Sequence, residues 1–453
     1  MQQTTAVMVS GTFPLLLLAK HSHTYTTVYR LSAAQMAFKA LFFTLFCLTL
    51  LRHSNSFASG VHCSSSTGTN HQKGTRLKDW KLKISDLDEG WDQEDLEKEV
   101  TELTVQMMKI DSTTGHEGRV VWFLKEYLEE RGWDVLLQEV GGDLCRDEGA
   151  PPRANLLATR PGEGPPRLLF NTHTDTVPPY LPPRVEGGTI WGRGACDAKG
   201  IAAAQVAAAA RLARRGVAGV GLLLVAGEEV DHAGARAASA LGLAPAYVVI
   251  GEPTEGRQVR LQKGLLKLRL TTAGKACHSG YPEEGHSAID DLIELLHELK
   301  HETWPSDPAL GATTLNIGLL RGGQAANALA ERAEATLMFR AVGQPAKLRA
   351  RVERAVAKYP GATLAVVTAN SPVRLHLSAS QDARSAVTAA FNTDAAYLDL
   401  GDRCKQVLVG PGSILHAHCP TEQVGVAELA AAARQYARLA VELLAEEEEE
   451  GGR

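Results

Sequence analysis

Short apolar segments alternate with amphipathic ones from residue 95 onwards, and this alternation limits the possible folds more than any other feature of the sequence. Continuous apolar runs at 168–171, 219–226 and 247–250 have the length of buried strands, and the Ala-rich segment 200–215 has the length of a helix. Strands that are apolar on both faces and alternate with helices are typical of a mostly parallel sheet covered on both sides. The sequence therefore predicts an α/β fold.

The pattern changes between residues 262 and 370, where apolar residues recur at every second position. Four strands and two amphipathic helices are predicted here, in the order 265–272, 287–302, 313–320, 332–340, 346–359 and 362–368. The order βαββαβ is that of a ferredoxin-like unit. We therefore expect an α+β domain to be inserted into the α/β domain.

The insertion divides the α/β domain into two parts, expected at 93–261 and 371–445. The second part is predicted to contain two helices and one strand, at 380–391, 426–444 and 406–409. The chain ends in an acidic segment, 446–453, that begins with five consecutive Glu residues. A run of like charges predicts a solvated tail.

Residues 1–75 are interpreted as a targeting segment and linker. A charged start after Met36 precedes an apolar run at 40–51 and a small residue at Ala58, which is the layout of a secretory signal peptide. That run is too short to span a bilayer comfortably, so no stable membrane span is expected in the mature chain. We expect entry into the secretory pathway. A cytoplasmic location is the alternative, favoured by cysteines without evident partners beside the candidate site, at Cys196, Cys277 and Cys419.

Composition excludes several classes of protein. The chain has 47 Lys and Arg against 52 Asp and Glu, so it has no basic excess that would indicate nucleic acid as its main partner. Seven Cys in 453 residues are too few for a disulfide scaffold.

Ligand-type residues stand where the predicted parallel strands end and in the Gly-rich loop 192–200. The carboxyl edge of such a sheet is where sites are built, so we expect these side chains to converge. The candidates are His173, Asp175, Asp197, Glu228, Glu229, Glu252 and the two histidines His416 and His418. Each motif alone has an ordinary explanation, since an Asp in a Gly-rich loop often caps a helix and adjacent Glu residues are usually solvated. Converging His and carboxylates suit a dinuclear zinc-type site.

The motifs around these residues resemble those of the M20 metallopeptidase family, which includes acetylornithine deacetylases, succinyl-diaminopimelate desuccinylases and carboxypeptidases. The matching segments are NTHTDTVP, WGRGACDAKG, GEEVDHAG, IGEPTEG, GKACHSGYP, GGQAANA, NTDAAYL and GPGSILHAHCPTE. They follow the family order over about residues 95–445. The resemblance implies a zinc-exopeptidase-like catalytic domain with an inserted lid or dimerisation domain, in agreement with the predicted α/β and ferredoxin-like units.

The resemblance also implies a set of metal ligands. His173 and Glu252 would hold one divalent ion, Glu229 and His418 would hold a second, and Asp197 would bridge the two. The expected ions are zinc, with cobalt or manganese as alternatives that the same ligands accept.

Further residues would act on the substrate. Asp175 would orient a histidine ligand, and Glu228 would be the general base. In the inserted domain, His278 would stabilise the oxyanion, and Asn327 and Arg340 would bind the substrate, with Arg340 suited to a free carboxylate. Other histidines near the motifs are interpreted as scaffold or surface residues: His232, His286, His376 and His416.

By this resemblance the protein is expected to be a dinuclear-metal hydrolase that cleaves the amide bond of N-acyl amino acids or short peptides with a free carboxylate. A homodimer through the lid domain is expected. The alternative is an enzyme of the same fold that makes or hydrolyses N-acyl (lipidated) amino acids. A non-catalytic binding protein would have lost ligands, and all of them are present here.

Overall fold

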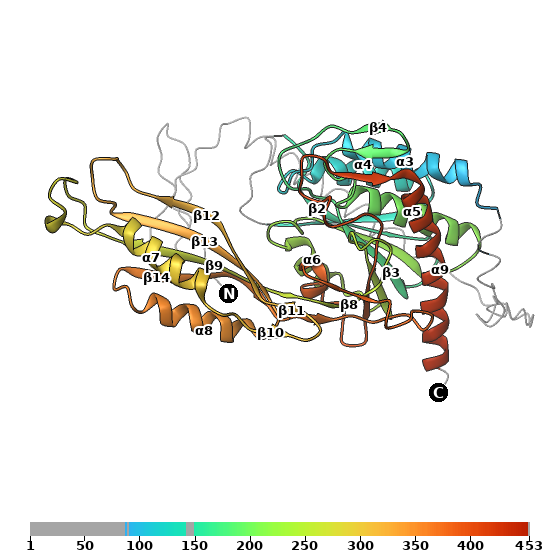
Figure 1. The fold of residues 1–453 in the computed structure, drawn as a ribbon. Helices are drawn as coiled ribbons and strands as arrows, with labels where there is room; N and C mark the ends of the chain where they lie inside the picture. Colours follow the sequence, from blue (N-terminus) through green and yellow to red (C-terminus); the bar gives the residue numbers. More distant parts are fainter. Residues whose placement is uncertain (1–86, 88–89, 142–148, 452–453) are drawn as a thin grey trace, which may run out of the picture. The chain divides into compact units, whose positions relative to one another are not determined.

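The computed structural model describes residues 87, 90–141 and 149–451 (Figure 1). All of these belong to one unit, Leu77–Arg453. The predictions made for residues 1–75 therefore lie outside the described residues. Within the described part, no helix combines the length and the apolar character that a membrane span requires.

A six-stranded mixed sheet forms the centre of the larger domain. In sheet order its strands are β1 (Asp134–Glu139), β2 (Ala154–Thr159), β6 (Val220–Val225), β3 (Leu168–His173), β7 (Tyr247–Ile250) and β17 (Lys405–Leu408). The last four pair in parallel, whereas β1 and β2 are antiparallel to their neighbours. Every residue of β3, β6 and β7 is buried, as the apolar sequences of β6, β7 and the first half of β3 predict.

The two faces of this sheet belong to two separate apolar cores. On one face Leu168 and Phe170 pack against helices α3 (Gln93–Met108), α4 (Gly118–Glu129), α5 (Lys199–Arg214) and α9 (Val426–Gly451). On the other face Leu169 packs with the short helix α6 (Ala233–Ala238) and with residues after the insertion. This alternation along one strand covers both faces of the sheet, so its carboxyl edge is the part left for a site.

Smaller elements complete this domain. β4 (Arg184–Glu186), β5 (Thr189–Trp191) and β18 (Gln423–Gly425) form one three-stranded sheet, and β8 (Val259–Gln262), β15 (Val373–Arg374) and β16 (Val387–Ala389) form another. Single 3₁₀ turns lie at Ser239–Leu241 and Asp394–Ala396, and another lies at Pro282–Glu284 in the insertion. The helix predicted at 380–391 is wrong, because this segment turns at Asp382, whose carboxylate accepts the N–H of Arg384, and then pairs with β8. Tertiary pairing here overrides a sequence of good helix formers.

The acidic run near the C-terminus also differs from its prediction. Residues 446–450 are the last turns of α9, which ends at Gly451. Glu447 and Glu448 pair with Arg167 at 2.7 and 3.3 Å, and Glu446 accepts the N–H of Ala379 at 2.7 Å. Residues 448–450 are exposed, as a solvated charge run predicts, whereas Glu446 and Glu447 meet partners that are distant in the sequence and that a local pattern does not reveal.

The insertion is a four-stranded antiparallel sheet in the order β12-β13-β9-β14. Its elements follow the chain as β9 (Gly264–Ala273), α7 (Ala288–His301), β12 (Thr314–Gly322), β13 (Arg332–Ala341), α8 (Pro345–Val356) and β14 (Ala362–Asn370). Both helices lie along one side of the sheet and share its apolar core (Figure 1). A short pair, β10 (Ser306–Asp307) and β11 (Gly311–Ala312), follows α7. The predicted α/β domain with a ferredoxin-like insertion is therefore confirmed.

Candidate metal centre

The predicted ligands come together at the carboxyl ends of the parallel strands. His173 is the last residue of β3, and Glu228 and Glu252 follow the ends of β6 and β7 by two or three positions. The ligand atoms of His173, Glu228 and Glu252 lie within 4.8 Å of one another, and so do those of His173, Asp197 and Glu229. Strand ends, together with the loop that carries Asp197, therefore place four carboxylates in two groups that share His173.

The two carboxylate oxygens of Asp197 face two different histidines. Oδ1 lies 2.9 Å from Nε2 of His173, and Oδ2 lies 3.2 Å from Nε2 of His418. The same His418 nitrogen is 2.9 Å from Oε2 of Glu229. Ligand atoms of one tetrahedral zinc ion, each about 2.0–2.1 Å from it, lie roughly 3.4 Å apart. These separations and donor types fit two ions that share Asp197.

Asp175 holds the loop that carries Glu228 and Glu229. Its buried carboxylate accepts the backbone N–H groups of Gly227, Glu228 and Glu229 at 2.9, 3.0 and 3.2 Å. Thr114 donates its hydroxyl to the same carboxylate at 2.7 Å. These bonds aim the two glutamates at the site.

Asp175 also lies beside His173, through its backbone as well as its side chain. Nδ1 of His173 is 3.0 Å from the Asp175 carbonyl oxygen and 3.5 Å from its carboxylate. A ring nitrogen bonded on one side leaves Nε2 free to act as a ligand.

The site contains more negatively charged side chains than positively charged ones. Burial, followed by repulsion from Glu252, raises the pKa of Glu228. Burial and the charge of Asp197 raise the pKa of Glu229 to about 7. Hydrogen bonds to Asp197 and Glu229 raise the pKa of His418 to about 10. A cation at this point would relieve the repulsion between the carboxylates and would displace the proton of the histidine.

Glu422 is a buried residue that the sequence analysis did not single out. Its Oε1 accepts the N–H groups of Gly194, Cys196 and Asp197, and its Oε2 pairs with Arg193 at 2.5 Å. β18, which follows Glu422, pairs with β5, which precedes the loop of Asp197, so the same two segments are also joined through their backbones. The only sequence signal for Glu422 was its place at the end of the GPGSILHAHCPTE segment.

Two of the substrate-binding candidates in the insertion lie together. His278 and Asn327 are both exposed, and the N–H of Ser279 donates to the Asn327 carbonyl at 3.0 Å. Nδ1 of His278 accepts the N–H of Gly280 at 3.1 Å. The neutral ring therefore carries its proton on Nε2, where it can be donated. Among the described residues, the groups of potential ligands do not include His278.

Arg340, at the end of β13, lies in the electrostatic environment of the site. Burial lowers the pKa of its guanidinium, and the charges of Glu228 and Tyr397 oppose this effect. Arg340 is thus a partly buried cation on the side of the site where Glu228 lies.

One histidine that the sequence analysis interpreted as scaffold lies next to Glu228 of the site. His232 forms a third group of potential ligands with Glu228 and Asp394. The interpretation holds better for His376 and His286, which bond Glu446 and Asp291 at 3.1 and 2.7 Å. His232 was missed because Asp394 is 162 residues away in the sequence.

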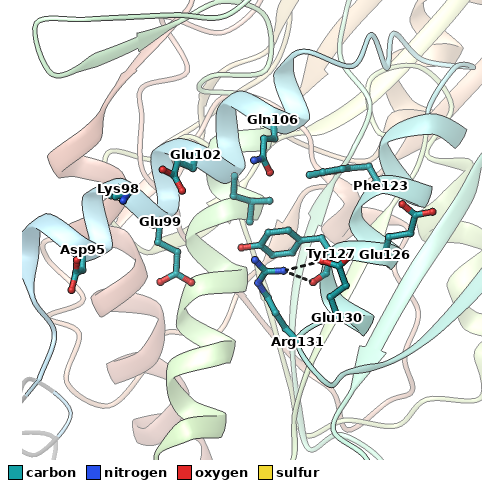
Figure 2. Close-up of a pocket in the computed structure, with 11 residues that line it drawn as sticks. Asp95, Lys98, Glu99, Glu102, Gln106, Phe123, Glu126, Tyr127, Glu130 and Arg131 are labelled. Atoms are coloured by element: carbon teal, nitrogen blue, oxygen red, sulfur yellow. Dashed lines mark hydrogen bonds and ion pairs between the residues drawn. The ribbon is translucent and has the colours of Figure 1, made fainter.

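A separate cavity of about 480 Å³ lies between α3 and α4, as Figure 2 shows. Its lining consists mainly of charged side chains, together with Phe123 and Tyr127, and Arg131 lies over the ring of Tyr127 at 3.5 Å. No candidate ligand lines it, so the cavity is distinct from the metal centre.

Comparison with known proteins gives consistent matches. The model of the peptidase family M20/M25/M40 matches residues 169–442. A peptidase M20 domain-containing protein of Schizosaccharomyces pombe is 36% identical over 338 residues, which are 74% of this chain and 82% of that protein. A probable carboxypeptidase of Aspergillus flavus is 36% identical over 369 residues, with 74% and 87% covered. A Bacillus subtilis protein, described as a dinuclear metal-binding peptidase from this family, has a similar fold, with a TM-score of 0.54 at 15% identity over 77% of this chain and 98% of its own.

Proposed function

Since the chain belongs to the M20/M25/M40 peptidase family and is a metal-dependent peptidase, we propose that it uses two metal ions. Its proposed reaction is hydrolysis of the amide bond of N-acyl amino acids or short peptides that carry a free carboxylate. The observation that carries the proposal is the position of Asp197. Each of its oxygens faces a different histidine, as a carboxylate shared by two ions requires. The Bacillus subtilis protein with this fold is described as binding two metal ions, which supports the proposal.

Two divalent ions held by these residues, zinc or alternatively cobalt or manganese, would supply Lewis-acid chemistry that activates water and polarises the substrate carbonyl. Glu228 lies beside the ligands, and we assign it the role of general base that takes the proton of the attacking water. Because burial and Glu252 already raise its pKa, its carboxylate can accept a proton and pass it to the leaving amine.

We assign substrate recognition to the inserted domain. Arg340 is a partly buried guanidinium near Glu228, so a substrate carboxylate bound to it would place the neighbouring amide within reach of the base. His278, with Nε2 free to donate, would stabilise the oxyanion, and the adjacent Asn327 would bind the substrate.

The shared carboxylate can be tested by metal content. Asp197→Ala should leave both ions weakly held, whereas Glu229→Ala and Glu252→Ala each remove a ligand from one ion and should retain about one. The measurement is metal per chain after dialysis, by atomic emission. Equal losses in the three variants would argue against a bridging carboxylate.

The substrate class can be tested with pairs of substrates. N-acyl amino acids and dipeptides should be hydrolysed by the metal-loaded enzyme, and the same compounds with the carboxylate converted to an amide should react at least tenfold more slowly. Arg340→Met should remove this difference, while Arg374→Met, an exposed arginine on β15, should preserve it. Equal rates for both members of each pair with the wild-type enzyme would exclude carboxylate recognition. A strong preference for long acyl chains would favour the N-acyl (lipidated) amino acid synthase or hydrolase.

A further inference from the structure

Glu228, His232 and Asp394 form a group of potential ligands that shares Glu228 with the group around His173. Nδ1 of His232 lies 2.9 Å from Oδ1 of Asp394 and 3.8 Å from Oε1 of Glu228. The three ligand atoms all lie within 4.8 Å of one another. The side chains of His232 and Asp394 are 8% and 3% exposed, and that of Glu228 is 11% exposed, so water satisfies little of their charge.

The geometry and donor types of this group suit a small divalent cation. One imidazole nitrogen and two carboxylate oxygens are a common zinc ligand set. Ligand atoms of a tetrahedral zinc ion lie roughly 3.4 Å apart, and the two separations from His232 Nδ1, 2.9 and 3.8 Å, fall on either side of this value. The third separation, between the carboxylate oxygens of Glu228 and Asp394, is at most 4.8 Å, so the three atoms lie around one small volume.

The ring of His232 is held in place from outside the group. It stacks on the ring of Tyr397 with centroids 4.1 Å apart and planes at 23°. The Tyr397 hydroxyl donates to Oδ1 of Asn370 at 2.7 Å. The backbone of His232 has φ of 52°, in the left-handed region that few non-glycine residues adopt. The histidine is therefore oriented before any ion binds, which lowers the cost of forming the site.

The charge of the centre favours an additional cation. Six carboxylates surround it with little exposure: Asp175, Asp197, Glu228, Glu229, Glu252 and Asp394. Two divalent ions would compensate four of these charges, and Arg340 would compensate one until a substrate carboxylate binds it. A residual negative charge then remains in a region where interactions are screened weakly by water.

We propose that Glu228, His232 and Asp394 form a third, inhibitory binding site for a zinc-like divalent cation. The inhibition rests on the proposed role of Glu228 as general base: a cation bound to its carboxylate lowers the proton affinity of that group, so it no longer takes the proton of the attacking water. Occupancy of this site turns the enzyme off when the free metal concentration rises, without loss of the two ions held through Asp197. The His232 nitrogen gives the site its preference for zinc over magnesium or calcium.

The test uses the full chain loaded with two ions, equilibrated with free Zn²⁺ from 1 μM to 1 mM. Bound zinc is measured by equilibrium dialysis, and turnover is measured in the same samples. We expect a third ion to bind as turnover falls, with matching midpoints. Magnesium over the same range should have neither effect.

Two variants remove the third site without touching the five ligands of the other ions. His232→Asn suits a left-handed backbone and can still donate to Asp394, but its amide is a poor zinc ligand. Asp394→Asn removes one anionic ligand and keeps the shape. Both should raise the zinc midpoints for binding and inhibition at least tenfold. His286→Asn, which breaks an exposed His–Asp pair elsewhere, should leave both midpoints unchanged.

Each outcome decides the proposal. Inhibition with equal midpoints in wild type, His232→Asn and Asp394→Asn would place the inhibitory ion elsewhere and overturn it. Absence of a third ion in the wild type up to 1 mM would also overturn it. Binding of a third ion without loss of turnover would remove the inhibitory role. If the wild type hydrolyses none of the substrates, the proposed function fails, while the dialysis still determines whether the third site exists.

Discussion

Glu422 accepts the backbone N–H of Asp197 at 3.1 Å, across 225 residues of sequence. The same oxygen accepts the N–H groups of Gly194 and Cys196, while the other oxygen pairs with Arg193. A single buried carboxylate therefore fixes the backbone of the proposed bridging ligand. Because Glu422 lies four residues after His418, it also ties the two ligand loops together.

Replacing Glu422 by Gln should weaken metal binding without removing a ligand. The amide keeps the shape of the side chain but loses the ion pair with Arg193. Its NH₂ group would also face donors that the carboxylate now accepts, which is unfavourable. We expect the metal affinity to fall about 10–100-fold, as is usual for residues that hold metal ligands in place. Competition with a chelator measures the affinity. Glu428→Gln is the matched control, because Glu428 accepts only the N–H of Gly412 among these loops. Unchanged affinity in Glu422→Gln would contradict the assignment.

Replacing Glu228 by Gln should separate catalysis from metal binding. The amide retains the size of the carboxylate but cannot accept a proton, so turnover should fall by at least about 10²–10⁴-fold. Both ions should remain bound, because none of the five proposed ligands is changed. The rate with saturating substrate and the metal content of the same preparation are the two measurements. Retention of more than a tenth of the normal rate would show that another residue is the base.

Glu117 makes the stability of the fold depend on pH. It is fully buried and pairs with Arg153 at 3.0 Å. Burial and the charge of Asp175 nevertheless raise its pKa from 4.5 to about 7, and Arg153 only partly opposes them. Between pH 4.5 and about 7 the folded state therefore binds more protons than the unfolded state. The stabilising contribution of protonated Glu117 is present at low pH and is lost as the pH rises through this range.

The variant Glu117→Gln tests this sign. The free energy of unfolding of the wild type should fall more steeply between pH 4.5 and 7 than that of the variant. The difference in slope should be at most about 1.4 kcal/mol per pH unit, the value for one proton. Urea unfolding at several pH values, with a chelator present so that metal release does not contribute, gives both slopes. The exposed Glu126→Gln serves as control. Identical slopes for wild type and Glu117→Gln would contradict the prediction.

The sequence was sufficient for those features that have a local pattern. The apolar runs of β3, β6 and β7 end shortly before the site residues His173, Glu228 and Glu252, so strand ends and site could be predicted together. The period-two strands of the insertion predicted its ferredoxin-like order. The resemblance to the M20 family was confirmed by the family model and the relatives.

Features that depend on distant contacts could not be predicted in this way. The pair of His232 and Asp394, and the cradle that Glu422 forms around Asp197, join segments more than 150 residues apart. Their side chains have no periodicity, so only the folded chain reveals that they meet. The last turns of α9 are a similar case, because the pairing of Glu447 with Arg167 joins residues 280 positions apart.

The final prediction concerns a dimer with shared sites. Among the described strands, β12 pairs only with β13, so it forms an edge of its sheet. Leu319 and Leu320 on this edge strand are 57% and 59% exposed. We propose that this edge pairs with itself in an isologous dimer and that His278 of one protomer serves the metal centre of its partner.

The variants Glu228→Gln and His278→Ala, each inactive alone, should then complement each other. In a mixed dimer one site carries both lesions and the other carries none. Random assortment makes about half of the dimers mixed, so activity should recover to about a quarter of wild type. Absence of recovery, after a tag pull-down has confirmed subunit exchange, would mean that His278 acts within its own chain or that the enzyme works as a monomer.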